Sequence, residues 1–266
     1  MDDFIKNYGT LTIAIYGVVQ VWIIGIWNRY FRKGTLEIHK TSKLEVGYSN
    51  FGPTIALNGT LRAKDTNVFI SNAQITIKRK SNNSTRIFNW TAFRSPQIKI
   101  GKTEPITLEM PSGFIVNIDS PYRFHIFFSD YDTQKELEPY LIKVNNDWTT
   151  FLNNKNEEIN SVSSEKDTNI SNYIEYLFNS EFTKTTKSFN DAFDILNRKV
   201  YWEPGEYEAE LVFTSDAKGE LVKDIWKFKI AQKDFDQLRL NSISTLSELC
   251  LGKINYSFIY PDYENE

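Results

Sequence analysis

The side chains that most often carry out chemistry are few in this chain, and their spacing matches no known catalytic or metal motif. The chain has two histidines, His39 and His125, and one cysteine, Cys250. None of them belongs to a His-x-His, His-Glu-x-x-His or Cys-x-x-Cys motif, so the spacing of a zinc site is absent. Cys250 lies among leucines in a predicted helix, where a cysteine is usually a small core residue rather than a nucleophile. We therefore predict neither a metal nor a cofactor.

Signals for phosphate or carboxylate chemistry are also weak. Residues 101–103, Gly-Lys-Thr, match the end of a phosphate-binding loop, but the glycine that should precede them is missing, so we interpret them as a turn. Asp130 and Asp132 share one face of an extended segment and could touch a cation, although an EF-hand loop needs more ligands. Three alternating glutamates are more typical of a solvated strand edge than of a catalytic set: Glu206, Glu208 and Glu210.

The segment that should organise the rest of the chain lies near the N-terminus. Residues 7–28 carry no charge and form a nearly continuous apolar run. A helix rises about 1.5 Å per residue and the bilayer core is about 30 Å thick, so we predict a single transmembrane helix over residues 9–28, after a short tail of residues 1–8. A cleaved signal peptide is the alternative, but the acidic start and the bulky residues after the run disfavour it.

Basic residues are distributed unevenly around this run. Lys6 alone precedes it, whereas residues 29–34 form a basic linker that contains Arg29, Arg32 and Lys33. Because positive residues stay on the cytoplasmic side, we predict a single-pass membrane protein with a cytoplasmic C-terminal domain and the lipid bilayer as a partner. Over the whole chain the net charge is only −3 and the charges are interspersed, so we expect no nucleic-acid partner.

One polar residue within the predicted span suggests self-association. Gln20 lies near its centre, with Gly17 and Gly25 on roughly the same side of the helix. Amide side chains hydrogen-bond across helices in membranes, and small residues let two backbones approach. A homo-oligomer through Gly17, Gln20 and Gly25 is therefore one hypothesis, although no Gly-x-x-x-Gly motif supports it and monomeric anchors tolerate a lone glutamine.

Residues 35–266 form the predicted folded domain, which is mainly β. Many short alternating segments follow one another up to about residue 132, each bounded by Gly, Pro, Ser or Asp. A parallel sheet would need helices between its strands, so we predict an antiparallel β-sandwich with inserted and C-terminal helices. Gly59 within one segment indicates a bulge or a close backbone approach. The clearest hairpin spans residues 202–230, where lysines of the second strand can pair with the three glutamates of the first.

Helices are predicted in an insertion of about residues 133–200 and near the C-terminus. Pro139 should keep the first helices short, and residues 153–171 resemble a polar loop. Apolar residues with a spacing of three and four then predict a helix: Phe189, Ala192, Phe193 and Leu196. Residues 234–251 predict another, with Gly252 as its end.

The sequence of the hairpin also suggests a fold family. The run Pro204-Gly205-x-Tyr207-x-Ala209-x-Leu211 resembles the late strands of immunoglobulin-like and fibronectin type III-like sandwiches, in which a turn leads to a strand tyrosine. The paired cysteines of true immunoglobulin domains are absent, so the resemblance implies the architecture only.

These patterns favour a non-enzymatic, membrane-anchored β-sandwich that binds a protein or ligand. Loops and the helical insertion should carry the contacts, and Tyr173, Tyr176 and Phe178 are candidate partner-binding residues. A membrane-associated enzyme with a dispersed site at Asp130, Asp132 and His125 is the alternative. A sensor or effector that oligomerises through its transmembrane helix is a third possibility, and an exported adhesive sandwich a fourth if the predicted topology is wrong.

Overall fold

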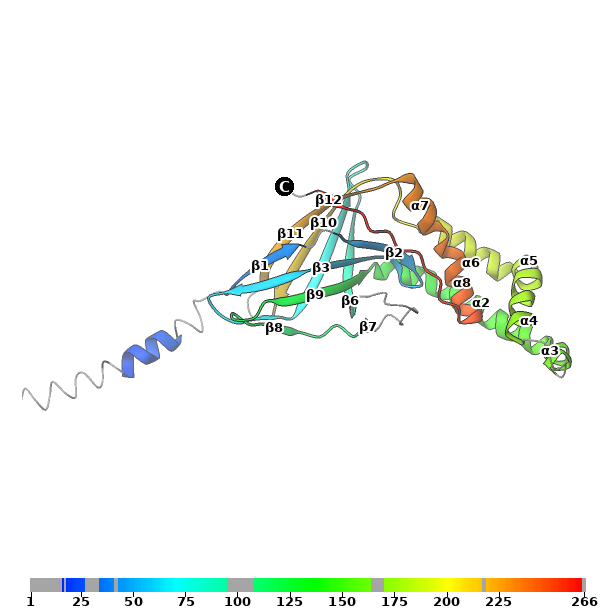
Figure 1. The fold of residues 1–266 in the computed structure, drawn as a ribbon, viewed down its shortest axis with the longest axis horizontal. Coiled ribbons are helices and arrows are strands. Elements are labelled where there is room, and N and C mark those ends of the chain that lie inside the picture. The colour runs from blue at the N-terminus through cyan, green and yellow to red at the C-terminus, as the bar shows by residue number, and fades with distance from the viewer. Residues whose placement is uncertain are drawn as a thin grey trace, which may run out of the picture.

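The chain folds into one strongly curved antiparallel sheet with helices gathered at one end of it (Figure 1). The computed structural model describes residues 16, 18–26, 34–40, 43–94, 108–163, 170–216 and 219–264. The strands are β1 Thr35–Lys40, β2 Glu45–Ser49, β3 Gly52–Lys64, β4 Val68–Ile70, β5 Asn72–Arg79, β6 Thr85–Arg94, β7 Leu108–Glu109, β8 Phe114–Val116, β9 Tyr122–Ser129, β10 Gly205–Ser215, β11 Gly219–Ile230 and β12 Tyr263–Glu264. The helices are α2 Tyr131–Asn154, α3 Asn156–Ser163, α4 Ile170–Leu177, the π-helix η1 Phe178–Phe182, α5 Thr183–Thr185, α6 Lys187–Arg198, α7 Gln232–Arg239 and α8 Asn241–Leu251.

The sheet curves until its two ends meet. Its strand order is β1-β3-β9-β6-β5-β10-β11-β12, with β2 also paired to β3 and β7 to β6, while β4 and β8 form a separate pair. Lys40 of β1 donates a hydrogen bond of 2.5 Å to the carbonyl of Ile225 in β11 and forms an ion pair of 2.7 Å with Asp224. We call the line along which β1 and β2 face β11 the seam.

The predicted immunoglobulin-like β-sandwich is therefore wrong. A sandwich has two stacked sheets, whereas hydrogen-bonded neighbours here run without a break from β1 to β11 in one nearly closed sheet. Alternation of polar and apolar residues shows which side of a strand is buried, and both architectures bury one side. The pattern could not distinguish a stacked pair of sheets from one curved sheet.

The hairpin of β10 and β11 confirms the predicted alternation. Four inward side chains of β10 are fully buried: Tyr207, Ala209, Leu211 and Phe213. Glu206 stands opposite Lys229 and Glu208 opposite Lys227, as expected for pairing of opposite charges across strands. β10 is nevertheless an internal strand between β5 and β11, so its glutamates lie on the outer face of the sheet and not on an edge.

Gly59 is confirmed as a site of close approach. A Cβ atom on Gly59 would lie 2.6 Å from the ring of Phe124, its register partner on β9. The ring covers the glycine and is itself almost fully buried against Phe213, at 5.6 Å between ring centroids.

Two predictions about the helices are wrong. α2 is 24 residues long and continues through Pro139. Pro139 lies on the exposed side of the helix, where water can bond the carbonyl that proline leaves without its helical donor. The polar tract of residues 153–171 contains α3, so it is not simply a loop. The predicted end of the last helix is confirmed, because Gly252 caps α8 in a left-handed conformation with φ of 66°.

Within the described part of the chain, no helix is both long and apolar enough to cross a membrane. Of the span predicted over residues 9–28, the structure describes helix at residues 16 and 18–26, with Gln20 and Gly25 exposed, while Gly17 lies outside the described residues. A spanning helix needs about 20 residues. The predicted transmembrane helix is therefore not supported by the described residues. The turn predicted at residues 101–103 also lies outside the described residues.

Candidate functional site

The residues that the sequence suggested for catalysis are not brought together. His125 and Asp130 lie five positions apart along β9 and its end, and at about 3.4 Å per residue their Cα atoms are roughly 17 Å apart. Asp130 is buried, whereas Asp132 is exposed. Burial raises the pKa of the Cys250 thiol to about 12, which keeps it protonated and unreactive. Among the described residues, no group of three His, Cys, Asp or Glu side chains could hold a metal ion.

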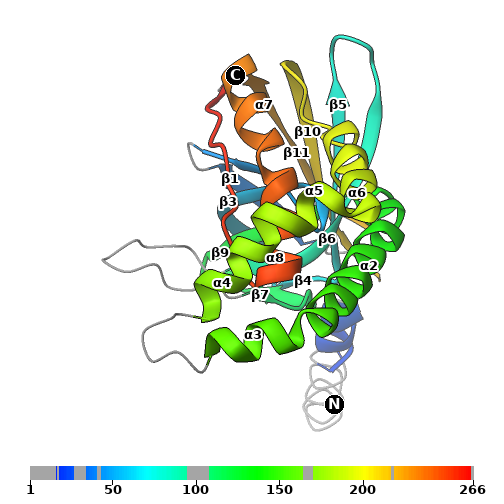
Figure 2. The ribbon, with the colours of Figure 1, turned by 90° about the vertical axis from the view of Figure 1, so that its right-hand side faces the viewer.

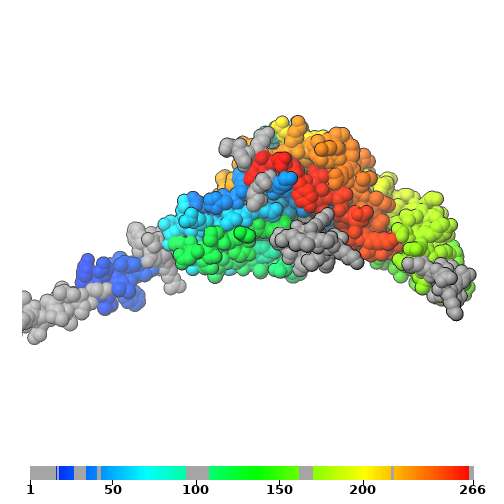
Figure 3. Space-filling view, viewed as in Figure 1, coloured from blue at the N-terminus to red at the C-terminus, as the bar shows by residue number. Residues whose placement is uncertain are grey.

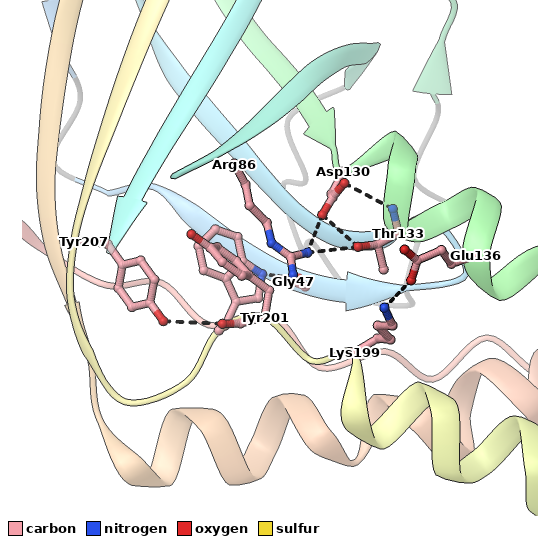
Figure 4. A network of polar contacts seen from close by, with 9 residues as sticks. Gly47, Arg86, Asp130, Thr133, Glu136, Lys199, Tyr201 and Tyr207 are labelled. Carbon is pink, nitrogen blue, oxygen red and sulfur yellow. Dashed lines mark hydrogen bonds and ion pairs between the residues drawn. The ribbon is translucent and has the colours of Figure 1, made fainter. Parts of the chain in front are cut away.

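Asp130 instead anchors the helices to the sheet (Figure 4). Its Oδ1 accepts a hydrogen bond of 3.2 Å from the backbone N–H of Thr133, which makes Asp130 the N-cap of α2. Its Oδ2 accepts from the Thr133 hydroxyl at 2.8 Å and from Nη1 of Arg86 on β6 at 2.6 Å. The capping spacing of Asp130 and Thr133 is visible in the sequence, but nothing there points to Arg86, which pairs with them only through the fold.

Aromatic residues between α6 and β10 complete this junction. The guanidinium of Arg86 lies 4.6 Å from the ring centroid of Tyr201, and Nε1 of Trp202 donates to the carbonyl of Gly47 at 2.8 Å. The hydroxyl of Tyr207 donates to the carbonyl of Glu203, four residues upstream, at 2.6 Å. A tyrosine that bonds back to the backbone in this way is also found in immunoglobulin-type domains, so the resemblance is local. The junction holds the helices in place against the sheet.

The far end of the helical layer consists of α3, α4, η1 and α5, and we call it the helical tip (Figures 1 and 2). A cluster of aromatic rings holds it in place. Trp148 of α2 contacts Phe182 at 4.9 Å and Phe178 at 5.7 Å between ring centroids, and Phe189 of α6 lies 5.7 Å from Phe178. Phe178, which the sequence suggested as a contact residue, is only 1% exposed. It therefore supports the surface from beneath and cannot touch a partner.

The surface of the tip carries exposed aromatic groups in a fixed arrangement. Tyr176 is 59% exposed and stacks on Tyr173, with ring centroids 6.2 Å apart and planes inclined by 21°. The Tyr173 hydroxyl donates to the carboxylate of Glu158 on α3. This hydrogen bond raises the pKa of Tyr173 and, together with Lys155, lowers the pKa of Glu158. The two candidates Tyr173 and Tyr176 are therefore brought together.

Ion pairs surround these rings. Nζ of Lys155 lies 2.9 Å from a Glu158 oxygen and 3.0 Å from a Glu181 oxygen, and these contacts raise the pKa of Lys155. Glu175, next to Tyr176, pairs with Lys253 beyond the end of α8. We call three partly or fully exposed side chains of α4 the tip surface: Ile170, Tyr173 and Tyr176.

Neither a protein-family model, nor a curated protein, nor a solved structure matches the chain. The exposed rings of the tip surface lie beside ion-paired groups on a support of buried rings. The density of aromatic residues in the sequence selected Tyr173, Tyr176 and Phe178 together but could not separate Tyr176, which is exposed, from Phe178, which is buried.

Proposed function

We propose that this chain is a non-enzymatic binding protein whose tip surface contacts a partner protein. The observation that carries the proposal is Tyr176, a tyrosine more than half exposed, held against Tyr173 on a helix that continues directly into the buried ring cluster at Phe178. Tyrosine is among the residues that contribute most to protein interfaces, because it combines a large apolar ring with a hydroxyl group.

The rigidity of the support favours this function further. A side chain that is already held in its bound position loses less conformational freedom when a partner arrives. Glu158 fixes the hydroxyl of Tyr173, and Lys155 links α3 to η1 through Glu158 and Glu181. The tip surface is therefore organised before binding.

The test is a comparison of three full-length chains as bait in extracts of the cells that produce the protein. The chains are the wild type, Tyr176→Ala, and Tyr131→Ala, which removes a tyrosine of similar exposure, 50%, at the start of α2. We expect the wild type and Tyr131→Ala to retain the same protein in near-equal molar amount, and Tyr176→Ala to retain at least tenfold less. Retention of that protein by all three chains, or by none, would refute the proposal.

A further inference from the structure

The seam is closed by a segment from the other end of the chain. We call residues 256–264 the closing segment; it is the red stretch beside the blue strands in Figure 3. Val46 of β2 and Ile259 exchange two backbone hydrogen bonds, of 2.9 and 3.0 Å. Further along, β12 pairs with β11 at Lys227 and Phe228. The closing segment thus pairs with both sides of the seam and completes the ring of strands.

A buried amide recognises the backbone of this segment. Asn241, at the start of α8, is fully buried, and its Nδ2 donates to the carbonyls of Ser257 at 2.7 Å and Tyr48 at 2.9 Å. Its Oδ1 accepts from the backbone N–H of Ser257 at 2.8 Å. One side chain therefore joins β2 to an extended chain through main-chain atoms alone, as in binding by strand addition.

Side chains add selectivity to this backbone recognition. A Cβ atom on Gly47 would lie 2.7 Å from the ring of Phe258, so the absence of a side chain on Gly47 makes room for that ring. Ile259 is 5% exposed. The seam therefore prefers an extended segment with an aromatic residue followed by a branched aliphatic one.

Charge completes the match. Asp262 is the bridge partner of Lys43, so an acidic residue of the closing segment stands opposite a lysine. The seam thus fits an acidic extended chain, and residues 256–264 have that composition.

The connection to the closing segment leaves room for exchange. Residues 252–255 are all exposed, and Gly252 has a positive φ that ends α8. The contacts that hold the segment begin at Tyr256, whose hydroxyl donates to Glu248 of α8, and continue at Ser257 and Ile259; they do not depend on which chain supplies the segment. An identical segment from a second copy makes the same contacts at little cost.

We propose that the seam is a strand-addition site whose ligand is residues 256–264 of a second copy of this chain, so that exchange of the closing segment joins two copies. This surface is separate from the tip surface and does not depend on the proposed function.

The test uses full-length chains with Cys250→Ser, so that the introduced cysteines have no competitor. One chain carries Val46→Cys and a second, of different mass through a tag, carries Ile259→Cys. Hydrogen-bonded partners of antiparallel strands have Cα atoms about 5.5 Å apart, which suits a disulfide. After incubation and mild oxidation of the mixture, we expect a cross-linked heterodimer whose fraction rises with total protein concentration.

Three controls decide the outcome. Both substitutions in one chain should give an internal disulfide; if that bond forms while the mixture gives no heterodimer at any concentration, the proposal is wrong. A mixture of Tyr176→Cys and Ile259→Cys chains should give no heterodimer. If it cross-links as strongly as the mixture of Val46→Cys and Ile259→Cys chains, the proposal is also wrong. An excess of a synthetic peptide of residues 256–264 should suppress the heterodimer severalfold. Equal suppression by the same residues in reversed order would mean that the seam accepts any extended chain, against the proposed ligand.

Discussion

Nη1 of Arg86 lies 2.6 Å from Oδ2 of Asp130, and this ion pair joins the middle of the sheet to the start of the 24-residue helix α2. The Asp130 side chain is 6% exposed and that of Arg86 is 38% exposed, so water screens the pair only in part. Because the same carboxylate caps α2, one residue controls both the formation of the helix and its attachment to the sheet.

Replacement of Asp130 by alanine should therefore lower the free energy of unfolding more than replacement by asparagine. We expect Asp130→Ala to lower the free energy of unfolding by about 2–3 kcal/mol, because the cap and the partner of Arg86 are lost together. Asp130→Asn keeps an oxygen for the cap and should cost about 1 kcal/mol. Urea denaturation of the two variants checks this order, and equal losses would show that the cap contributes nothing.

Phe178 should contribute to the stability of the fold, whereas Tyr176 should contribute to binding and little to stability. Phe178→Ala removes a buried ring of the cluster beneath the helical tip and should lower the free energy of unfolding by about 3–5 kcal/mol. Tyr176→Ala removes an exposed ring and should change it by no more than about 0.5 kcal/mol. Denaturation of both variants is the measurement; a large loss in Tyr176→Ala would mean that this tyrosine is a structural residue.

Asn241 should control how firmly the closing segment is held. Asn241→Ala leaves main-chain groups of Ser257 and Tyr48 without their partner and should cost about 1–3 kcal/mol. Local opening should increase most at the segment, so amide hydrogen exchange at Ile259 should accelerate more than exchange in β10. Uniform acceleration would show that the segment does not open by itself. Asn197→Ala, which removes an amide bonded to the carbonyl of Phe193 within α6, is the matched control.

Buried tyrosines and Cys250 should make the protein less stable at high pH. Burial raises the pKa of Cys250 to about 12 and raises the pKa of Tyr48 and Tyr207 above the ordinary tyrosine value. Between the ordinary pKa and the raised one, the unfolded chain loses a proton that the folded chain keeps. From neutral pH upward, these groups should therefore leave stability unchanged to about pH 8.5 and lower it as the pH rises further.

Guanidinium denaturation at pH 8 and pH 10.5 measures this loss. Tyr48→Phe should reduce the pH-dependent part, because it removes one of the buried hydroxyls, even though it also loses the hydrogen bond of 2.7 Å to the carbonyl of Leu196. Equal stability at the two pH values would contradict the assignment. The Cys250 thiol of the folded protein should also resist alkylation at pH 8 and react only on unfolding.

The sequence was sufficient where local patterns decide the structure. Alternation of residues along β10 predicted which side chains are buried, and Gly59 and Gly252 marked a close approach and a helix end. In each case, the physical cause lies within a few residues of the position. The tyrosines of α4 could be selected as candidates for the same reason, because aromatic density is a local property.

The sequence failed where distant contacts decide. The sheet closes where the Lys40 side chain of β1 bonds to β11, a strand far away in the sequence. No local pattern distinguishes such a closed sheet from a sandwich. The pairing of Arg86 with Asp130 likewise joins residues from different elements. Phe178 looked like a surface candidate because its burial depends on Trp148 of another helix. The transmembrane prediction relied on hydropathy, whereas no helix within the described residues is long and apolar enough to span a bilayer.

The most direct test of the account is the affinity of the full-length protein for the partner that it retains, measured by calorimetry for the wild type, Tyr176→Ala and Tyr131→Ala. If the tip surface binds the partner, Tyr176→Ala should weaken the affinity by about 30-fold, the equivalent of about 2 kcal/mol, while Tyr131→Ala leaves it unchanged. Equal affinities for all three chains would contradict the assignment of the tip surface as the binding site.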